Sequence, residues 1–70
     1  MRFSYTEHAE MRLNERAITK AQVQGEFHGV DAVKIHGGRY RKELLVDGLD
    51  LVVIYERRRD TYHVVTVYVR

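Results

Sequence analysis

The chain has 70 residues, with 12 Lys or Arg, 10 Asp or Glu and no Cys. A domain of this size is near the lower limit for folding without a covalent or metal staple. The lack of Cys excludes disulfide bonds and thiolate metal sites. Neither a run of roughly 18 apolar residues, as in a membrane span, nor the apolar region of a signal peptide occurs in the sequence. We therefore expect one soluble cytoplasmic domain, 1–70, without membrane contact.

The formal net charge is +2, and the isoelectric point is about 9.2. Residues 1–30 are balanced, with four basic and four acidic residues, whereas residues 31–70 have eight basic against six acidic. Most of the surplus lies in two clusters, Arg39/Arg41/Lys42 and Arg57/Arg58/Arg59. This mild surplus is compatible with a nucleic-acid partner but does not require one.

Two helices are predicted in the first half of the chain. The first spans Thr6 to about Arg16, with Thr6 or Ser4 as its cap, because this segment lacks Gly and Pro and is rich in good helix formers. Its apolar stripe at helical spacing consists of Tyr5, Ala9, Leu13 and Ala17. A second, shorter helix is predicted over residues 20–24, with Thr19 as N-cap and Gly25 or Gly29 at its end.

Four strands are predicted in the second half, at about 32–36, 39–46, 49–56 and 62–69. They are rich in β-branched and aromatic residues and are separated by turns at Gly37-Gly38, Asp47-Gly48 and residues 57–60. Tight turns would set residue 36 opposite 39, 46 opposite 49, and 57 opposite 60. The predicted fold is α+β, with two N-terminal helices packed on one face of a four-stranded antiparallel meander sheet, in the order ααββββ.

Strand alternation sorts the side chains onto two faces of this sheet. The face expected beneath the helices holds one charge, Lys42, among Val33, Ile35, Tyr40, Leu44, Val46, Leu49, Leu51, Val53, Tyr55, Tyr62, Val64, Thr66 and Tyr68. The other face is expected to be open. It combines a polar end with an apolar patch that we define as Leu45, Val52, Val65, Val67 and Val69.

The polar end of the open face is the first candidate site. Its residues are Lys34, His36, Arg39, Arg41, Glu56 and His63, and the tight-turn register puts Lys34, Arg41, Ile54 and His63 in one cross-strand row. Imidazole exchanges protons near neutrality, and guanidinium stabilises charge on a phosphate. These functions suffice for RNA cleavage without a metal. The alternative is a solvated face whose mixed charges only maintain solubility.

A second candidate site lies on the first helix. His8, Arg12 and Arg16 follow one another at i, i+4 and i+8 and form a stripe beside the apolar one. The stripe could contact phosphate. Alternatively, its long side chains cover the edge of the core with their stems and keep their charges in water.

Neither a metal nor any other cofactor is expected. The four histidines, His8, His28, His36 and His63, show no HxxxH or HExxH spacing. Gly37-Gly38 lacks the context of a phosphate-binding loop and is interpreted as a turn. Three of the five tyrosines, Tyr40, Tyr55 and Tyr62, fall on the covered face and are assigned to the core.

The opening segment, residues 5–19, resembles a family of small prokaryotic proteins known only as a domain of unknown function, whose usual opening is His-Ala-x-x-Arg-Met-x-x-Arg-Gly-Ile-Ser. Identical positions are His8, Ala9, Arg12, Arg16 and Ile18, while Leu13, Ala17 and Thr19 replace Met, Gly and Ser. The closing segment, residues 64–68, is similar to the family's Val-x-Thr-Val-Tyr ending.

The resemblance implies a fold like that of RelE/ParE and BrnT toxins, which are typically metal-independent ribonucleases held inactive by an antitoxin. The polar positions it transfers to this chain are His8, Arg12, Arg16 and Thr66. Related folds have unrelated roles, so the site itself must support any assignment.

Two main hypotheses follow. In the first, the chain is a toxin-like endoribonuclease with His63 or His8 as acid or base and Arg41 at the reacting phosphate. RNA would be bound by Arg12, Arg16, Lys34, His36, Arg39 and Thr66, and an antitoxin would dock on the apolar patch. In the second, the chain is a non-catalytic module that dimerises or binds a protein through this patch. A weaker third option is a plain nucleic-acid binder that uses residues 57–59 and whose affinity falls with added salt.

Overall fold

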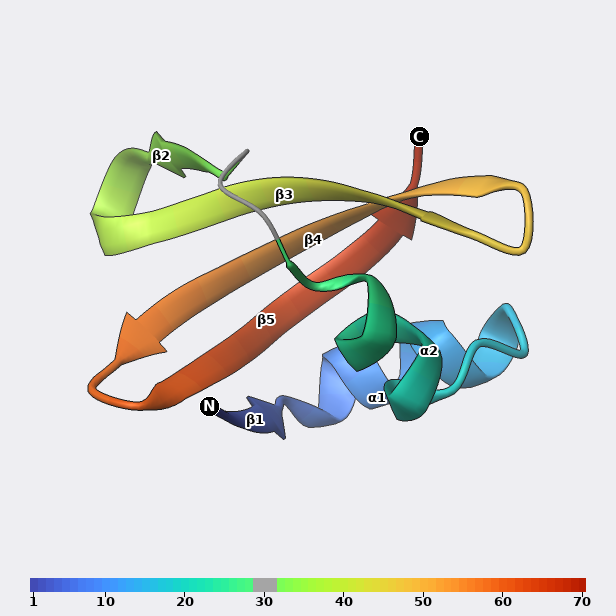
Figure 1. Ribbon diagram of the computed structural model, residues 1–70, viewed down its shortest axis with the longest axis horizontal. Coiled ribbons are helices and arrows are strands. Elements are labelled where there is room, and N and C mark those ends of the chain that lie inside the picture. The colour runs from blue at the N-terminus through green and yellow to red at the C-terminus, as the bar shows by residue number, and fades with distance from the viewer. Residues whose placement is uncertain (29–31) are drawn as a thin grey trace.

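A computed structural model of the chain describes residues 1–28 and 32–70. A five-stranded mixed sheet in the order β1-β5-β4-β3-β2 is covered on one face by two helices (Figure 1). The elements are β1 (Arg2–Tyr5), α1 (Glu7–Glu15), α2 (Lys20–Glu26), β2 (Val33–Ile35), a 3₁₀ turn (His36–Gly38), β3 (Arg39–Val46), β4 (Leu49–Arg58) and β5 (Thr61–Val69). Neither α1 nor α2 is long and apolar enough to cross a membrane. The predicted α+β class is confirmed, but the sheet differs from the predicted four-stranded antiparallel meander.

Both helices begin where the sequence predicts, because each has a threonine cap. The Thr6 hydroxyl accepts from the Ala9 amide at 3.0 Å and donates to the Val65 carbonyl at 2.6 Å, so it joins α1 to β5. The second cap, Thr19, forms a reciprocal capping box with Gln22. The first predicted end of α2, Gly25, lies inside the helix, and the second, Gly29, is outside the described residues.

The strand that sequence analysis missed is β1. It pairs in parallel with the start of β5, with Ser4 opposite His63, and sends Phe3 and Tyr5 toward the core. The sequence analysis assigned this segment to the approach to α1. A four-residue strand leaves little pattern, and its partner lies at the other end of the chain, so local periodicity could not indicate the pairing.

The predicted register is correct in one hairpin and shifted in another. Val46 lies opposite Leu49, as predicted. Between β2 and β3, however, Ile35 rather than His36 lies opposite Arg39. The cause is a three-residue 3₁₀ turn with Gly37 and Gly38 at φ 78° and 74°, a region that glycine enters without steric cost. Every residue of β2 is therefore displaced by one from its predicted partner.

The largest correction lies in β5. The last hairpin turns at residues 59–60, with Arg58 opposite Thr61, and a β-bulge at Val65 then shifts the pairing with β4. Beyond the bulge the faces exchange. Val67 is buried and Val69 packs against the core, whereas both were predicted on the open face. Conversely, Thr66 and Tyr68 belong to the open face and not, as predicted, to the covered one.

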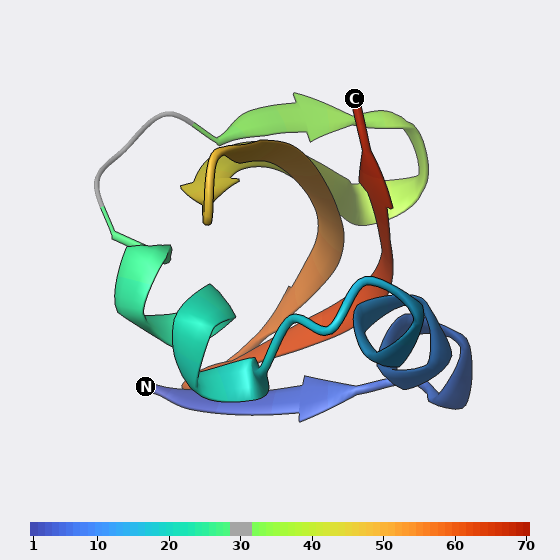
Figure 2. The same ribbon diagram turned by 90° about the vertical axis from the view of Figure 1, so that its right-hand side faces the viewer.

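The core lies between the helices and the concave side of a strongly curled sheet (Figure 2). Its buried hydrophobic side chains are Ala9, Leu13, Ile18, Val23, Leu44, Val46, Leu51, Val53, Tyr55, Val64 and Val67. An aromatic cluster closes one end, where the Phe27 ring lies 5.0 Å from Tyr55 and 4.8 Å from Tyr62 between centroids. Tyr40 stacks on Tyr55, so the assignment of these three tyrosines to the core is confirmed. Lys42 is buried, 5.7 Å from the Phe27 ring, also as predicted.

We expect Thr6→Ala to lower the free energy of unfolding by about 1–3 kcal/mol, because it removes a helix cap and leaves the bulge carbonyl without its donor. Urea unfolding followed by circular dichroism measures the change. Thr19→Ala, which removes only an exposed cap, is the matched control and should cost about 1 kcal/mol. Equal losses in the two variants would contradict the role of Thr6 as the link between α1 and β5.

Candidate functional site

A row of polar residues crosses four strands on the open face of the sheet. Ser4 on β1 lies opposite His63 on β5, His63 lies opposite Glu56 on β4, and Glu56 lies opposite Arg39 on β3. Directly opposite residues share a face, with Cβ atoms about 5 Å apart. We call these four residues, together with Arg58, whose guanidinium binds Glu56, the His63 row. Its far neighbour on β2 is Ile35, opposite Arg39.

The imidazole of His63 is held by β1. Its Nδ1 lies 2.7 Å from the Ser4 hydroxyl oxygen, and the side chain is half-buried. A hydrogen bond at one ring nitrogen orients the imidazole ring. Since Nδ1 is occupied, Nε2 is the nitrogen available for proton exchange with a ligand.

The carboxylate of Glu56 is held by two guanidinium groups. It accepts from Arg58 at 3.2 Å (Nε) and 2.7 Å (Nη2), and from the Nε of Arg39 at 3.3 Å. These hydrogen bonds, first from Arg58 and then from Arg39, lower the pKa of Glu56 below its usual value. The pairs are exposed, with 46% of the Arg39 side chain and 61% of the Arg58 side chain accessible. The row therefore combines an imidazole, an ionised carboxylate and two accessible cations.

Three predicted members of the site, Lys34, His36 and Arg41, lie outside this row. The one-residue shift of β2 puts Lys34 opposite Tyr40, in the register of the covered face, and Val33 opposite Arg41. His36 is exposed in the 3₁₀ turn. The predicted row of Lys34, Arg41, Ile54 and His63 is therefore wrong. Its observed counterpart is Val33, Arg41, Ile54 and Thr66.

Arg41 lies on the open face but in a separate polar cluster. It donates to Glu43 at 2.6 Å, and Arg70 donates to the same carboxylate at 2.7 Å. The Glu43 hydrogen bond raises the pKa of Arg41, with a smaller contribution from Tyr68. Glu43 and Tyr68 lie on either side of Val52, which is fully buried although it belongs to this face. The cluster thus covers an apolar residue of the sheet, and Arg41 is not next to His63.

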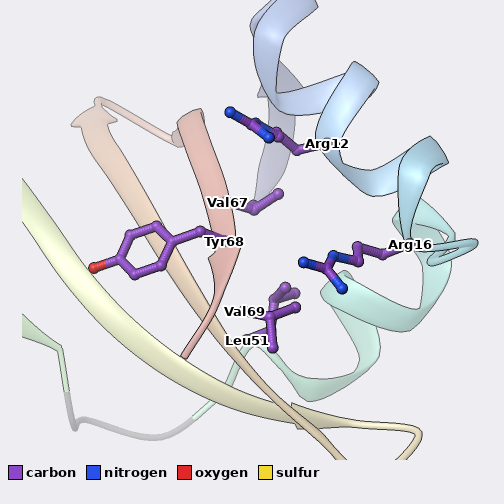
Figure 3. A pocket seen from close by; sticks show the side chains of 6 residues that line it. All are labelled: Arg12, Arg16, Leu51, Val67, Tyr68 and Val69. Carbon is purple, nitrogen blue, oxygen red and sulfur yellow. The ribbon is translucent and has the colours of Figure 1, made fainter.

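The basic stripe of α1 borders a pocket at the edge of the sheet. The pocket has a volume of about 90 Å³ and is lined by Arg12, Arg16, Leu51, Val67, Tyr68 and Val69. Both guanidinium groups extend from α1 toward β5, above apolar side chains (Figure 3). His8 lies exposed in the first turn of α1 and does not line the pocket. The structure thus separates the stripe into a pocket-forming arginine pair and an isolated histidine.

The predicted apolar patch is not an exposed surface. Val52 and Val67 are fully or almost fully buried, and Val69 packs against the core. Leu45 is 62% exposed, but its cross-strand partner is the polar residue Asp50, so it does not belong to an apolar cluster. The patch was predicted because the bulge at Val65 leaves no signature in the sequence.

Two residues of the site were not among the predicted ones. Ser4 was missed because its strand was missed, although its alternation with Phe3 and Tyr5 is a strand signal. Arg58 was predicted in the last turn, as a phosphate contact of the third hypothesis and not as part of the site, whereas β4 extends through it. Within residues 1–28 and 32–70, no group of three His, Asp or Glu residues could hold a metal ion.

Comparison of the chain with protein-family models, curated proteins and solved structures gives no match.

The pH dependence of stability should reflect the two arginine-bound carboxylates. Because hydrogen bonds lower the folded-state pKa of Glu56 and of Glu43, their stabilising contribution is present at neutral pH and is lost as pH falls below about 4.5 and through the folded pKa. Urea unfolding at a series of pH values measures this loss. In NMR titration, Arg58→Gln should raise the Glu56 pKa toward its ordinary value. An unchanged Glu56 pKa in that variant would contradict the assigned contact.

Proposed function

We propose that the chain is a metal-independent endoribonuclease, of the kind found as toxins in toxin–antitoxin systems, with the His63 row as its active site. The observation that carries this proposal is the row itself. An oriented imidazole, an ionised carboxylate and two accessible guanidinium groups lie on adjacent strands of one sheet face. The sequence resembles a family of unknown function whose expected fold is like that of such toxins, and this fold analogy favours the same class of reaction.

The reaction is cleavage by the RNA's own 2′-hydroxyl. This oxygen attacks the neighbouring phosphate, the bond to the 5′-oxygen breaks, and a 2′,3′-cyclic phosphate and a 5′-hydroxyl result. A base must accept the 2′ proton, an acid must protonate the leaving oxygen, and cations must stabilise the extra negative charge of the phosphorane. All atoms and protons are then accounted for without a metal.

Each of these roles has a candidate in the row. Glu56 is ionised at neutral pH and can accept the 2′ proton, but the hydrogen bonds from Arg58 and Arg39 lower its pKa and weaken it as a base while both arginines hold it. His63, directly opposite, can donate from Nε2 to the leaving oxygen, while Ser4 fixes the ring. A phosphate that binds Arg39 and Arg58 would draw both cations from Glu56 and free its carboxylate.

This assignment changes the predicted residue roles. His63 and Arg39 remain in the proposed site, whereas Arg41 belongs to the cluster around Glu43 and His8 is not part of the row. The dimerisation alternative lacks the apolar patch on which it depended, since Val52 and Val67 are buried. In the toxin proposal, an antitoxin would inhibit by covering the His63 row, where an acidic segment would pair with its cations.

We expect His63→Ala to reduce cleavage of single-stranded RNA by about 10²- to 10⁴-fold, the usual contribution of a general acid or base. Cleavage is measured by gel analysis of a labelled oligonucleotide, with the product end tested for cyclic phosphate. His28→Ala and His8→Ala remove exposed histidines outside the row and should retain activity. Their unfolding curves and that of His63→Ala establish that all three fold.

Two outcomes would overturn the proposal. One is full activity of purified His63→Ala. The other is a variant His8→Ala that loses activity while His63→Ala keeps it. Expression in bacteria gives a second measurement, because the wild-type chain should arrest growth and His63→Ala should not. Ser4→Ala should lie between them, since it leaves the imidazole in place but removes its orienting hydrogen bond.

A further inference from the structure

The pocket between α1 and β5 has the character of an anion-binding site. Two of its lining residues, Arg12 and Arg16, are cations, and none is acidic. Arg12 makes one weak contact, 3.4 Å to the exposed Glu15, and Arg16 forms no ion pair with any described residue. Like charges at i and i+4 on a helix repel each other, and an anion between them would remove this repulsion.

Both guanidinium groups belong to residues that line this one pocket. Figure 3 shows Arg12 and Arg16 extending from α1 toward β5, with their charged ends apart, Arg12 on the side of Val67 and Arg16 on the side of Val69 and Leu51. The apolar floor limits competition from water on one side. Planar guanidinium groups bind phosphate oxygens in a bidentate manner, and two of them can neutralise one phosphodiester.

The position of the pocket relates it to the proposed active site. Both lie along β5: His63 is opposite Glu56 near one end of β4, and Val69 is opposite Leu51 near the other. Glu56 and Leu51 are five positions apart on β4, which corresponds to roughly 17 Å of strand. A ligand that occupies both places must therefore be an extended chain with several phosphates, and a mononucleotide is too short.

The open face of β5 between these two places offers a surface for bases. The register places Thr66 beyond the bulge and then Tyr68, which is 46% exposed. In Figure 3 the Tyr68 ring projects away from the two arginines, on the other side of β5. Exposed aromatic rings stack on the bases of single-stranded nucleic acids, while cations along the groove contact the phosphates.

We propose that Arg12 and Arg16 form a phosphate-binding subsite for single-stranded RNA, separate from the reacting phosphate at the His63 row. The strand follows the open face of β5, with a base over Tyr68, and passes around the edge of β5 beyond its pairing with β1, so that a phosphate reaches the arginine pair on the α1 side. This inference rests on the proposed nuclease function for its choice of RNA as ligand. Its binding test is nevertheless independent of cleavage.

The test uses the full chain and a fluorescent single-stranded RNA of about six nucleotides, within the usual site sizes of such proteins. Its 2′-O-methyl groups remove the attacking hydroxyl, so binding is measured by anisotropy without cleavage. We expect Arg12→Gln/Arg16→Gln to weaken binding and to reduce the slope of log K against log salt by about 0.7, the value for one phosphate contact on a single strand. Tyr68→Ala should weaken binding about tenfold, whereas Tyr68→Phe should not.

A charge-matched control separates a specific pocket from overall charge. Lys34→Gln/Arg59→Gln removes the same two positive charges at exposed positions outside the pocket and the row, and should leave affinity nearly unchanged. Equal effects of the two double variants would overturn the subsite. So would failure of the wild-type chain to bind the RNA, or binding of inorganic phosphate or a mononucleotide as tight as that of the longer strand.

The two proposals fail in distinguishable ways. RNA that binds through Arg12 and Arg16 but is not cleaved in its unmodified form would overturn the nuclease assignment and leave the subsite intact. The reverse case is His63-dependent cleavage together with a variant, Arg12→Gln/Arg16→Gln, that binds the RNA with the affinity and salt slope of the wild-type chain. That result would overturn the subsite and leave the nuclease assignment intact.

Discussion

The arrangement of the molecule depends on the hydrogen bond that the Thr6 hydroxyl donates to the Val65 carbonyl. Val65 is the bulge residue of β5, and Thr6 directly follows β1 and caps α1. Before this point β5 pairs with β1, which brings Ser4 to His63. Beyond it, β5 lies beside α1 with its faces exchanged. One local irregularity therefore positions both the imidazole and the arginine pocket.

Sequence reasoning succeeded where the chemistry is local. Threonine caps gave the starts of both helices, and Asp47-Gly48 gave the register of the central hairpin, which in turn placed Lys42 and three tyrosines on the covered face. It failed where the geometry depends on distant partners. The parallel pairing of β1 and the bulge at Val65 both arise from contacts across the whole chain, and the three-residue turn after β2 differs from a two-residue turn only in backbone conformation. These three misses account respectively for the absence of Ser4 from the predicted site, for the false apolar patch and for the misplacement of Lys34.

Two carboxylates on the open face are each held by a pair of arginines, yet their surroundings differ. Glu43, between Arg41 and Arg70, lies next to a buried valine and has no imidazole in its row. Glu56, between Arg39 and Arg58, lies directly opposite His63. Exposed ion pairs contribute little to folding, typically below about 1 kcal/mol. The two clusters are therefore a natural comparison, since substitutions in either should leave the fold intact while only one adjoins a proton-transfer group.

The imidazole of His63, the ring of Tyr68 and the floor of the arginine pocket all belong in part to one strand, β5. Sites built on strands are held more precisely than sites on loops. Here the imidazole precedes the bulge, whereas Tyr68 and the floor of the arginine pocket follow it. Because the bulge turns the second half of β5 over, Val67 and Val69 fill the space beneath α1 while Tyr68 stays accessible on the other side. Without the extra residue, Tyr68 would point into the core and the pocket would lose its apolar floor. The bulge, which could not be detected in the sequence, therefore makes an extended binding surface along β5 physically possible.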